Sequence, residues 1–195
     1  MKEPLFYKYI AKPLIYIYVN ILLRPKVIGI EKIPSSKRVI LAGNHKNNLD
    51  SVLLVGINKR VIHFLAKDSL VKGWKKLIFN HMGIIPVNRS IHDKNALSKA
   101  IELLNENKAI GIFPEGTTNK TKEIILPFKI GAVKMASITE TEIIPFVITG
   151  EYNIFKNNLC IEFLDSIKVP KILDLTEYNI KLMNAISENI KGKVK

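Results

Sequence analysis

The sequence contains a single cysteine, Cys160, among its 195 residues. One cysteine excludes a disulfide within the chain and any zinc site built from several cysteines. Scarce cysteine is also typical of proteins kept in a reducing compartment. We therefore expect a protein exposed to the cytosol, with a length that suits one domain and a substantial core.

Acidic residues are few relative to basic ones. The chain has 17 Asp and Glu against 30 Lys and Arg, a net charge of +13, and a pI of about 9.7. This charge favours a polyanion or an anionic bilayer as partner. The lysines are spread along the chain without an RNA- or DNA-binding motif, so we expect no nucleic acid. With 47% hydrophobic residues the chain is not a disordered basic tail.

An apolar run long enough to cross a membrane is also lacking. Residues 5–23 are mostly apolar, but Lys8 and Lys12 interrupt them, and the longest stretch without charge, 13–23, has 11 residues. A spanning helix needs about 20 apolar residues. The Arg24-Pro25-Lys26 sequence that follows lacks the small residues of a signal-peptide cleavage site. We expect neither a full crossing nor a cleaved signal.

The apolar N-terminus instead has the composition of a segment at a membrane surface. Pro13 predicts a break between two short helices. Aromatic residues within the segment and basic residues beside it are typical of the lipid–water interface; the aromatic residues are Phe6, Tyr7, Tyr16 and Tyr18. We predict a docking segment over residues 1–26 and a globular domain over 27–195. A helix that covers the core of the domain is the alternative.

The rest of the chain alternates apolar strands with helices. Strands are predicted at 38–43, 61–66, 84–87, 109–113, 143–149 and 159–164. Helices are predicted at 49–57, 69–82, 95–107 and 130–138, with a C-terminal helix after a capping box of Asp174 and Glu177. This pattern predicts a single α/β domain with a largely parallel, mixed sheet flanked by helices. Functional residues are then expected at the carboxyl ends of the strands.

The first candidate for chemistry is Asn44-His45 with Asp50, where the first strand passes into a helix. On one continuous helix, His45 and Asp50 would lie about 140° apart, so their pairing requires a turn between them. A carboxylate on one imidazole nitrogen leaves the other nitrogen as a general base. No Gly-x-Ser-x-Gly elbow is present and Cys160 lies in an apolar strand, which predicts a substrate hydroxyl as nucleophile. Alternatively, Asp50 only caps the helix.

Three further segments follow strands or begin a helix. Gly83 to Arg89 is a strand that delivers one arginine, and Phe113 to Thr118 contains Pro114, Glu115, Gly116 and Thr117 just past a strand. Lys129 lies at a helix start, a position that suits an anionic ligand. The first two segments have an ordinary alternative: a surface arginine after an edge strand, and a Pro/Gly turn.

Taken in order, these segments resemble the motifs of the glycerolipid acyltransferase family, in particular the 1-acyl-sn-glycerol-3-phosphate (lysophosphatidic acid) acyltransferases. Asn44, His45 and Asp50 match an Asn-His-x4-Asp box, and Gly83 to Arg89 match a Gly-x-Ile-x-Val-x-Arg strand. Residues 113–117 match Phe-Pro-Glu-Gly-Thr, and 144–147 match an apolar Ile-Pro-Val strand. The chain departs from the third motif at Thr118 and Asn119, where Arg and Ser are usual.

The resemblance implies transfer of an acyl group from acyl-CoA or acyl carrier protein to the sn-2 hydroxyl of the lysolipid, which gives phosphatidic acid. It implies His45 as general base, Asp50 as its partner, and Arg89 as the phosphate ligand. Glu115, Gly116, Thr117 and Lys129 would form the rest of the phosphate pocket, with Asn44, Gly83 and Pro114 in support. No metal or other cofactor is implied.

The expected partners are therefore a lysophospholipid acceptor, an acyl thioester and an anionic membrane surface. The expected location is the cytoplasmic face of the cell membrane, as a peripheral or monotopic protein. Two alternatives stay open: an acyltransferase for glycerol 3-phosphate or another lysolipid, and a non-catalytic basic protein of the membrane surface.

Overall fold

The computed structural model describes residues 7–68, 84–88 and 93–193 of the protein. In these residues seven strands form one sheet in the order β1-β7-β6-β2-β5-β3-β4. The strands are β1 (Lys26–Ile28), β2 (Val39–Gly43), β3 (Ile62–Lys67), β4 (Ile85–Val87), β5 (Ala109–Ile112), β6 (Ile143–Thr149) and β7 (Cys160–Phe163). All neighbouring pairs are parallel except β6 and β7, which are antiparallel. The predicted largely parallel, mixed sheet is confirmed.

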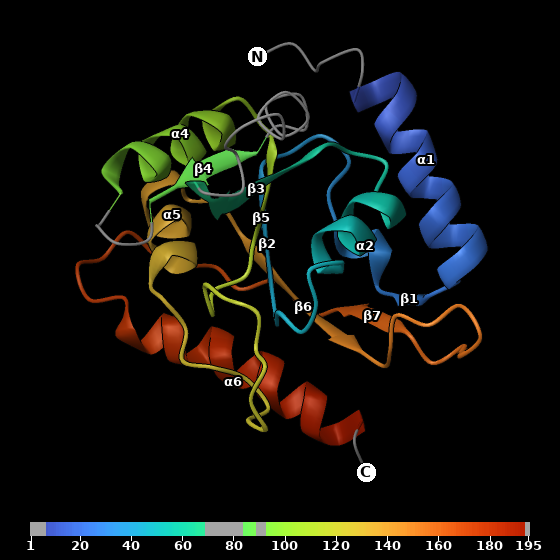
Figure 1. Ribbon diagram of the computed structural model, residues 1–195. Helices are drawn as coiled ribbons and strands as arrows, with labels where there is room; N and C mark the ends of the chain where they lie inside the picture. Colours follow the sequence, from blue (N-terminus) through green and yellow to red (C-terminus); the bar gives the residue numbers. More distant parts are fainter. Residues whose placement is uncertain (1–6, 69–83, 89–92, 194–195) are drawn as a thin grey trace.

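Helices cover both faces of the sheet (Figure 1). One face carries α4 (Lys94–Asn105), α5 (Gly131–Thr139) and α6 (Thr176–Lys193). The other carries α2 (Asp50–Ile57) and an N-terminal helical segment, Tyr7–Leu23, whose middle part is α1 (Lys12–Ile17). The predicted helix over 69–82 lies outside the described residues.

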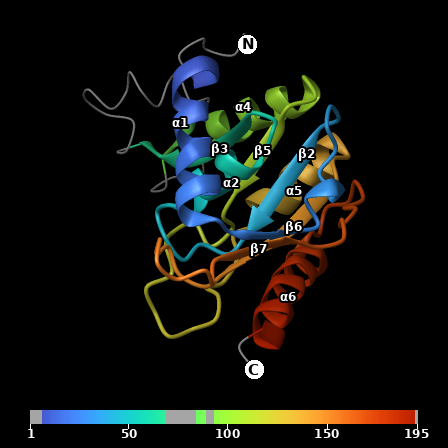
Figure 2. The ribbon, with the colours of Figure 1, turned by 90° about the vertical axis from the view of Figure 1, so that its right-hand side faces the viewer.

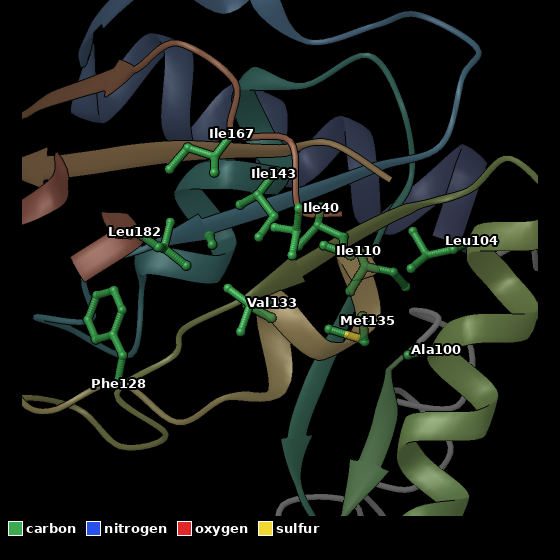
Figure 3. Close-up of a cluster of buried hydrophobic side chains, with 14 of the residues drawn as sticks. Ile40, Ala100, Leu104, Ile110, Phe128, Val133, Met135, Ile143, Ile167 and Leu182 are labelled. Carbon is green, nitrogen blue, oxygen red and sulfur yellow. The ribbon is translucent and has the colours of Figure 1, made fainter. Parts of the chain in front are cut away.

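Alternation along the central strands divides the core into two clusters. Ile40 of β2 packs with the helices α4, α5 and α6, whereas the next residue, Leu41, packs with α2 and the N-terminal segment. Successive side chains of a strand point to opposite faces, so a strand buried on both faces is apolar throughout. Figure 3 shows part of the first cluster, which includes Ile110 of β5, Ile143 of β6 and Val133 of α5.

The N-terminal segment differs from the prediction of two short helices. It continues through Pro13 as a π-helical stretch (Tyr7–Ala11), α1, and a second π-helical stretch (Tyr18–Leu23). A proline crowds the preceding turn of an α-helix, but here that turn has the wider winding of a π-helix, which lets the helix continue. Within the described residues, no helix combines the length and apolar character that a bilayer crossing requires.

This segment has two apolar faces. Val19 and Leu23 are buried in the second core cluster, and the Asn20 side chain donates a hydrogen bond to the carbonyl of Gly56 at 2.9 Å. The expectation of a core-covering helix is therefore correct for one face. The other face leaves large apolar side chains exposed: Tyr9, Ile10, Leu14, Tyr16, Ile17, Ile21 and Leu22.

Candidate active site

Asn44 extends the ladder between β2 and β6 and so sets the position of His45. Its side-chain amide donates to the carbonyl of Ile148 at 2.9 Å and accepts the N–H of Ile148 at 2.8 Å. The side chain thus replaces a peptide group that the ladder would otherwise need. Because Asn44 is buried, these are the bonds that satisfy its amide. His45 then emerges at the carboxyl edge of the parallel strands.

Aromatic rings hold the plane of the His45 imidazole. The ring of Phe113, just past β5, stacks on it with 4.2 Å between centroids and 14° between planes. Phe146 of β6 meets Phe113 edge-on at 6.0 Å, and a Cβ on Gly43 would lie 2.2 Å from the Phe146 ring. Glycine at position 43 is what allows Phe146 to reach this place. The imidazole is therefore supported from neighbouring strands.

His45 and Asp50 are paired, as the sequence predicted. His45 Nδ1 lies 2.9 Å from Asp50 Oδ2, and Asp50 is the first residue of α2. The chain turns between them because Asp50 Oδ2 also accepts the backbone N–H groups of Lys46 and Asn47, at 2.7 and 2.8 Å. The Asp50 side chain is fully buried, and 16% of the His45 side chain is exposed. A buried carboxylate with three donors on one oxygen fixes the imidazole orientation.

Tyr152 is a member of this site that sequence reasoning missed. Its hydroxyl donates a hydrogen bond to the other oxygen of Asp50, Oδ1, at 2.6 Å. Burial, followed by the adjacent charge of Asp50, raises the pKa of Tyr152, so it remains a phenol that donates. Tyr152 lies in the segment after β6, at the carboxyl edge of the sheet. The rule that sites form at strand ends could have indicated this segment, but not this residue.

The second nitrogen of His45 faces a small polar group. Thr118 Oγ1 lies 3.3 Å from His45 Nε2 and 3.2 Å from Asn48 Oδ1, so its single hydroxyl hydrogen has two acceptors within reach. With Nδ1–H directed at Asp50, Nε2 presents a lone pair to this position. Thr118, which replaces the usual Arg of the third motif, therefore places a hydroxyl where a general base would meet its proton donor.

Glu115 connects two loops beneath the site. One carboxylate oxygen accepts the N–H of His45 at 2.7 Å and the other accepts the N–H of Leu126 at 2.8 Å. Burial raises the pKa of Glu115, although the two backbone bonds act in the opposite direction. Both oxygens are thus engaged by the protein itself. The role of Glu115 in a phosphate pocket stays a prediction, and its observed contacts hold the pocket loops together.

Lys129 lies against the turn formed by Pro114, Glu115 and Gly116. Its N–H donates to the carbonyl of Pro114 at 2.9 Å. Gly116 has a φ of +71°, and a Cβ there would lie about 3 Å from the Lys129 ammonium nitrogen. Glycine suits both the left-handed backbone and the close lysine. Lys129 and Thr117 are exposed, whereas Pro114 is buried.

The structure thus gathers His45, Asp50, Asn44, Pro114, Glu115, Gly116 and Lys129 at one edge of the sheet, with Thr117 on the same turn. Gly83 and Arg89 lie outside the described residues, so their predicted roles stay predictions. In the described ranges, no group of three or more His, Cys, Asp or Glu side chains could hold a metal ion.

A separate pocket of about 870 Å³ lies at the opposite edge of the sheet, where strands begin. Val39, Asn107 and Glu142 are among its lining residues. None of its lining residues belongs to the His45 site, so this pocket is not part of the candidate active site.

The chain is similar to a family model and to known proteins that are described as acyltransferases. The family model described as Acyltransferase matches residues 24–149. The 1-acyl-sn-glycerol-3-phosphate acyltransferase of Borreliella burgdorferi is 34% identical over 168 residues, which cover 82% of this chain and 67% of that protein. The enzyme of the same description from Bacillus subtilis is 32% identical over 127 residues, which cover 64% of this chain and 62% of that protein. The chain thus spans about two thirds of these relatives.

Among solved structures, the chain is similar to the 1-acyl-sn-glycerophosphate (LPA) acyltransferase from Thermotoga maritima. The TM-score is 0.73 with 20% sequence identity, and the alignment covers 92% of this chain and 78% of that chain. At this identity the likeness shows that the two chains share a fold.

Proposed function

This chain belongs to the acyltransferase family, and from that premise we propose that it transfers an acyl group from a thioester to the sn-2 hydroxyl of 1-acyl-sn-glycerol 3-phosphate. The product is phosphatidic acid, a phospholipid precursor. The described activity of the curated relatives supports this acceptor. The observation that carries the chemistry is the His45–Asp50 pair, with Nδ1 bound to a buried carboxylate and Nε2 turned toward a hydroxyl.

In the proposed mechanism His45 acts as the general base. Its Nε2 takes the proton of the acceptor hydroxyl while the hydroxyl oxygen attacks the thioester carbonyl. The tetrahedral intermediate then expels the thiol, as the carbon–sulfur bond breaks and the imidazolium returns the proton to sulfur. Asp50 holds the imidazole and stabilises its positive charge. The acyl group ends as an ester on the acceptor, and the thioester donor leaves as free CoA or carrier thiol.

Thr118 marks where the acceptor hydroxyl must lie. Its Oγ1 occupies hydrogen-bonding distance from Nε2, so the acceptor hydroxyl takes its place when the substrate binds. Asn48 Oδ1, 3.2 Å from Thr118 Oγ1, is the alternative acceptor for the Thr118 hydroxyl once the substrate hydroxyl donates to Nε2.

The acceptor phosphate is proposed to bind Arg89 and Lys129. A guanidinium suits two parallel bonds to a phosphate, and the exposed Lys129 ammonium adds a point charge beside Gly116. Glu115, Gly116 and Thr117 shape the turn below. Asn44 and Pro114 support the same loops, and Gly83 is proposed to act in support because it belongs to the same sequence motif as Arg89.

We further propose that the enzyme works at the cytoplasmic face of the cell membrane as a peripheral or monotopic protein. The acceptor and product carry acyl chains that belong in a bilayer. The exposed apolar face of the N-terminal helix would lie on that bilayer, and the net charge of +13 favours anionic lipids.

One assay tests this function. Labelled acyl-CoA and labelled acyl carrier protein are each offered with vesicles that contain 1-acyl-sn-glycerol 3-phosphate, and phosphatidic acid is measured. His45→Ala should abolish transfer, with vesicle binding and circular dichroism unchanged. A His45→Ala protein that kept most of the wild-type rate would contradict the mechanism.

A panel of acceptors separates the remaining possibilities. Preference for glycerol 3-phosphate or another lysolipid would replace the acceptor but keep the chemistry. Vesicle binding without transfer to any acceptor would identify a non-catalytic membrane-surface protein.

A further inference from the structure

The segment between β6 and β7 exposes two apolar side chains next to the active site. We define residues 151–158 as the β6–β7 loop. Phe155 is 88% exposed and Ile154 is 42% exposed. Transfer of a large aromatic side chain from water into an apolar environment is favourable. Phe155 and Ile154 are therefore the residues of the loop that would gain most from contact with an apolar partner.

The loop holds Phe155 outward through its own hydrogen bonds. The N–H of Phe155 donates to Asn153 Oδ1 at 2.9 Å, and the N–H of Lys156 donates to the carbonyl of Asn153 at 3.2 Å. Lys156 also pairs with Glu151 at 2.9 Å. The turn is thus built around Asn153, and Phe155 protrudes from a defined backbone.

The β6–β7 loop is joined to the end of the N-terminal helical segment. Arg24 donates to the carbonyl of Ile154 at 3.4 Å, and the N–H of Lys26 donates to the carbonyl of Leu159 at 2.9 Å. Figures 1 and 2 both show the loop, in orange, beside the end of the blue helix. Ile21 and Leu22, at that end, are 58% and 46% exposed. Two segments far apart in sequence thus expose apolar side chains together.

The charge around these side chains is positive. Arg24 and Lys26 are exposed, while the acid of the loop, Glu151, is paired with Lys156. Apolar side chains that protrude between basic residues fit an anionic lipid surface, in which the rings enter the acyl region and the cations meet the headgroups.

We propose that the β6–β7 loop is a second membrane-contacting element, which inserts Phe155 and Ile154 into an anionic phospholipid surface beside the N-terminal helix. The inference rests on the proposed function, because a lysolipid acceptor comes from the bilayer. The same loop carries Tyr152, whose hydroxyl bonds to Asp50 at 2.6 Å on the inner side. Lipid contact on the outer side thus brings the bilayer next to the His45–Asp50 pair.

The fluorescence of a tryptophan placed at position 155 tests the contact of the β6–β7 loop with lipid. Trp74 is first replaced by phenylalanine, and Phe155→Trp is then mixed with vesicles of phosphatidylglycerol and phosphatidylcholine, or of phosphatidylcholine alone. The matched control is Leu173→Trp, at a fully exposed apolar residue in the segment before α6. Figures 1 and 2 show this segment on the side of the molecule away from the β6–β7 loop. We expect blue-shifted emission and quenching by brominated lipid for Phe155→Trp on anionic vesicles, and neither for Leu173→Trp.

A second measurement uses Phe155→Ala. Loss of the ring should weaken binding to anionic vesicles about tenfold, with transfer to a short-chain, water-soluble acceptor unchanged. Leu173→Ala should change neither quantity. Equal emission from Phe155→Trp and Leu173→Trp, or unchanged vesicle binding by Phe155→Ala, would overturn the proposal.

The outcomes also separate this inference from the proposed function. Quenching of Phe155→Trp by lipid, without acyl transfer by the wild type, would retain the contact and reject the enzyme. Transfer by the wild type without quenching would do the reverse. A dimer in solution that Phe155→Ala dissociates would assign the loop to a protein interface and reject the lipid contact.

Discussion

Removal of one oxygen atom from Tyr152 tests how the active site holds its carboxylate. Tyr152→Phe keeps the ring and deletes the hydroxyl that donates to Asp50 Oδ1 at 2.6 Å. Asp50 is fully buried, so water is not in place to replace the lost donor. Its other oxygen keeps the backbone donors Lys46 and Asn47. The carboxylate would be left able to tilt, and the imidazole would tilt with it.

The size of the effect follows from the charge on the acceptor. A hydrogen bond to a charged group contributes about 1.5–3 kcal/mol. If the transition state felt all of it, kcat would fall about 10- to 150-fold. Because two backbone donors remain on Asp50, we expect the lower end, about a tenfold loss in kcat. The KM for the acyl donor should stay unchanged, since Tyr152 has no proposed contact with it.

The assay compares kcat, KM and thermal unfolding for the wild type, Tyr152→Phe and a control, Tyr178→Phe, whose ring packs on the first core cluster. Tyr152→Phe should also lower the free energy of unfolding by about 1.5–3 kcal/mol, because Asp50 Oδ1 loses its donor. A kcat within twofold of the wild type, with Tm lowered, would show that Tyr152 serves stability alone and would refute the positioning role.

Three further outcomes follow from the same contacts. Glu115→Gln should lower the free energy of unfolding by about 1–3 kcal/mol, because a Gln amide cannot accept at both His45 and Leu126. Burial raises the pKa of Glu115 in the folded state, so the folded protein keeps this proton to a higher pH than the unfolded chain does, and the contribution of Glu115 to the free energy of unfolding falls as the pH rises from the unfolded pKa through the folded one. Urea titrations between about pH 4 and pH 7 should therefore show a free energy of unfolding that depends less on pH in Glu115→Gln than in the wild type. Equal pH dependence in the two proteins would contradict the assignment. Arg89→Ala should raise the KM for the acceptor about tenfold or more, with a smaller loss of kcat; steady-state kinetics with varied acceptor decide this, and an unchanged KM would remove Arg89 from the phosphate site. Replacement of the exposed residues Leu14, Ile17 and Ile21 by serine should abolish co-flotation of the protein with vesicles. The Tm should be retained, since these side chains lie outside the core. Unchanged flotation would reject docking through this helix.

The last of these is a sharper test than deletion of residues 1–23. Deletion would also remove Val19 and Leu23, which are buried against α2. Loss of membrane binding in the deleted chain would then not be separable from loss of packing. The two apolar faces of one helix explain why composition suggested both a docking segment and a core helix.

The sequence determined much of the site because the chemistry follows strand ends. Apolar runs that alternate with helical spacing predict a parallel sheet, and parallel strands bring their carboxyl ends to one edge. Asn44, His45 and Asp50 could thus be placed near Pro114 and Glu115 before any contact was known. The turn that pairs His45 with Asp50 was also expected, because a helix begins at Asp50.

Other features could not be read from local spacing. Lys26–Ile28 is too short to predict as a strand, and the antiparallel direction of β7 depends on the loop that precedes it. Pro13 suggested a helix break, but the wider turn before it is a property of the backbone path. In the same way, the residues next to Glu115 in the sequence are those of an ordinary turn. Only the folded chain shows that its carboxylate accepts hydrogen bonds from two backbone amides.

By itself, therefore, the sequence determined the fold class, the acyltransferase motifs and the His45–Asp50 pair, all of which depend on residues a few positions apart or on strand periodicity. Tertiary structure alone decided that the hydroxyl of Tyr152, 102 positions along the chain, donates a hydrogen bond to Asp50. It also decided that the β6–β7 loop lies at the end of the N-terminal helix. The physical reason is that sheet order, which no local pattern encodes, determines which strand ends become neighbours.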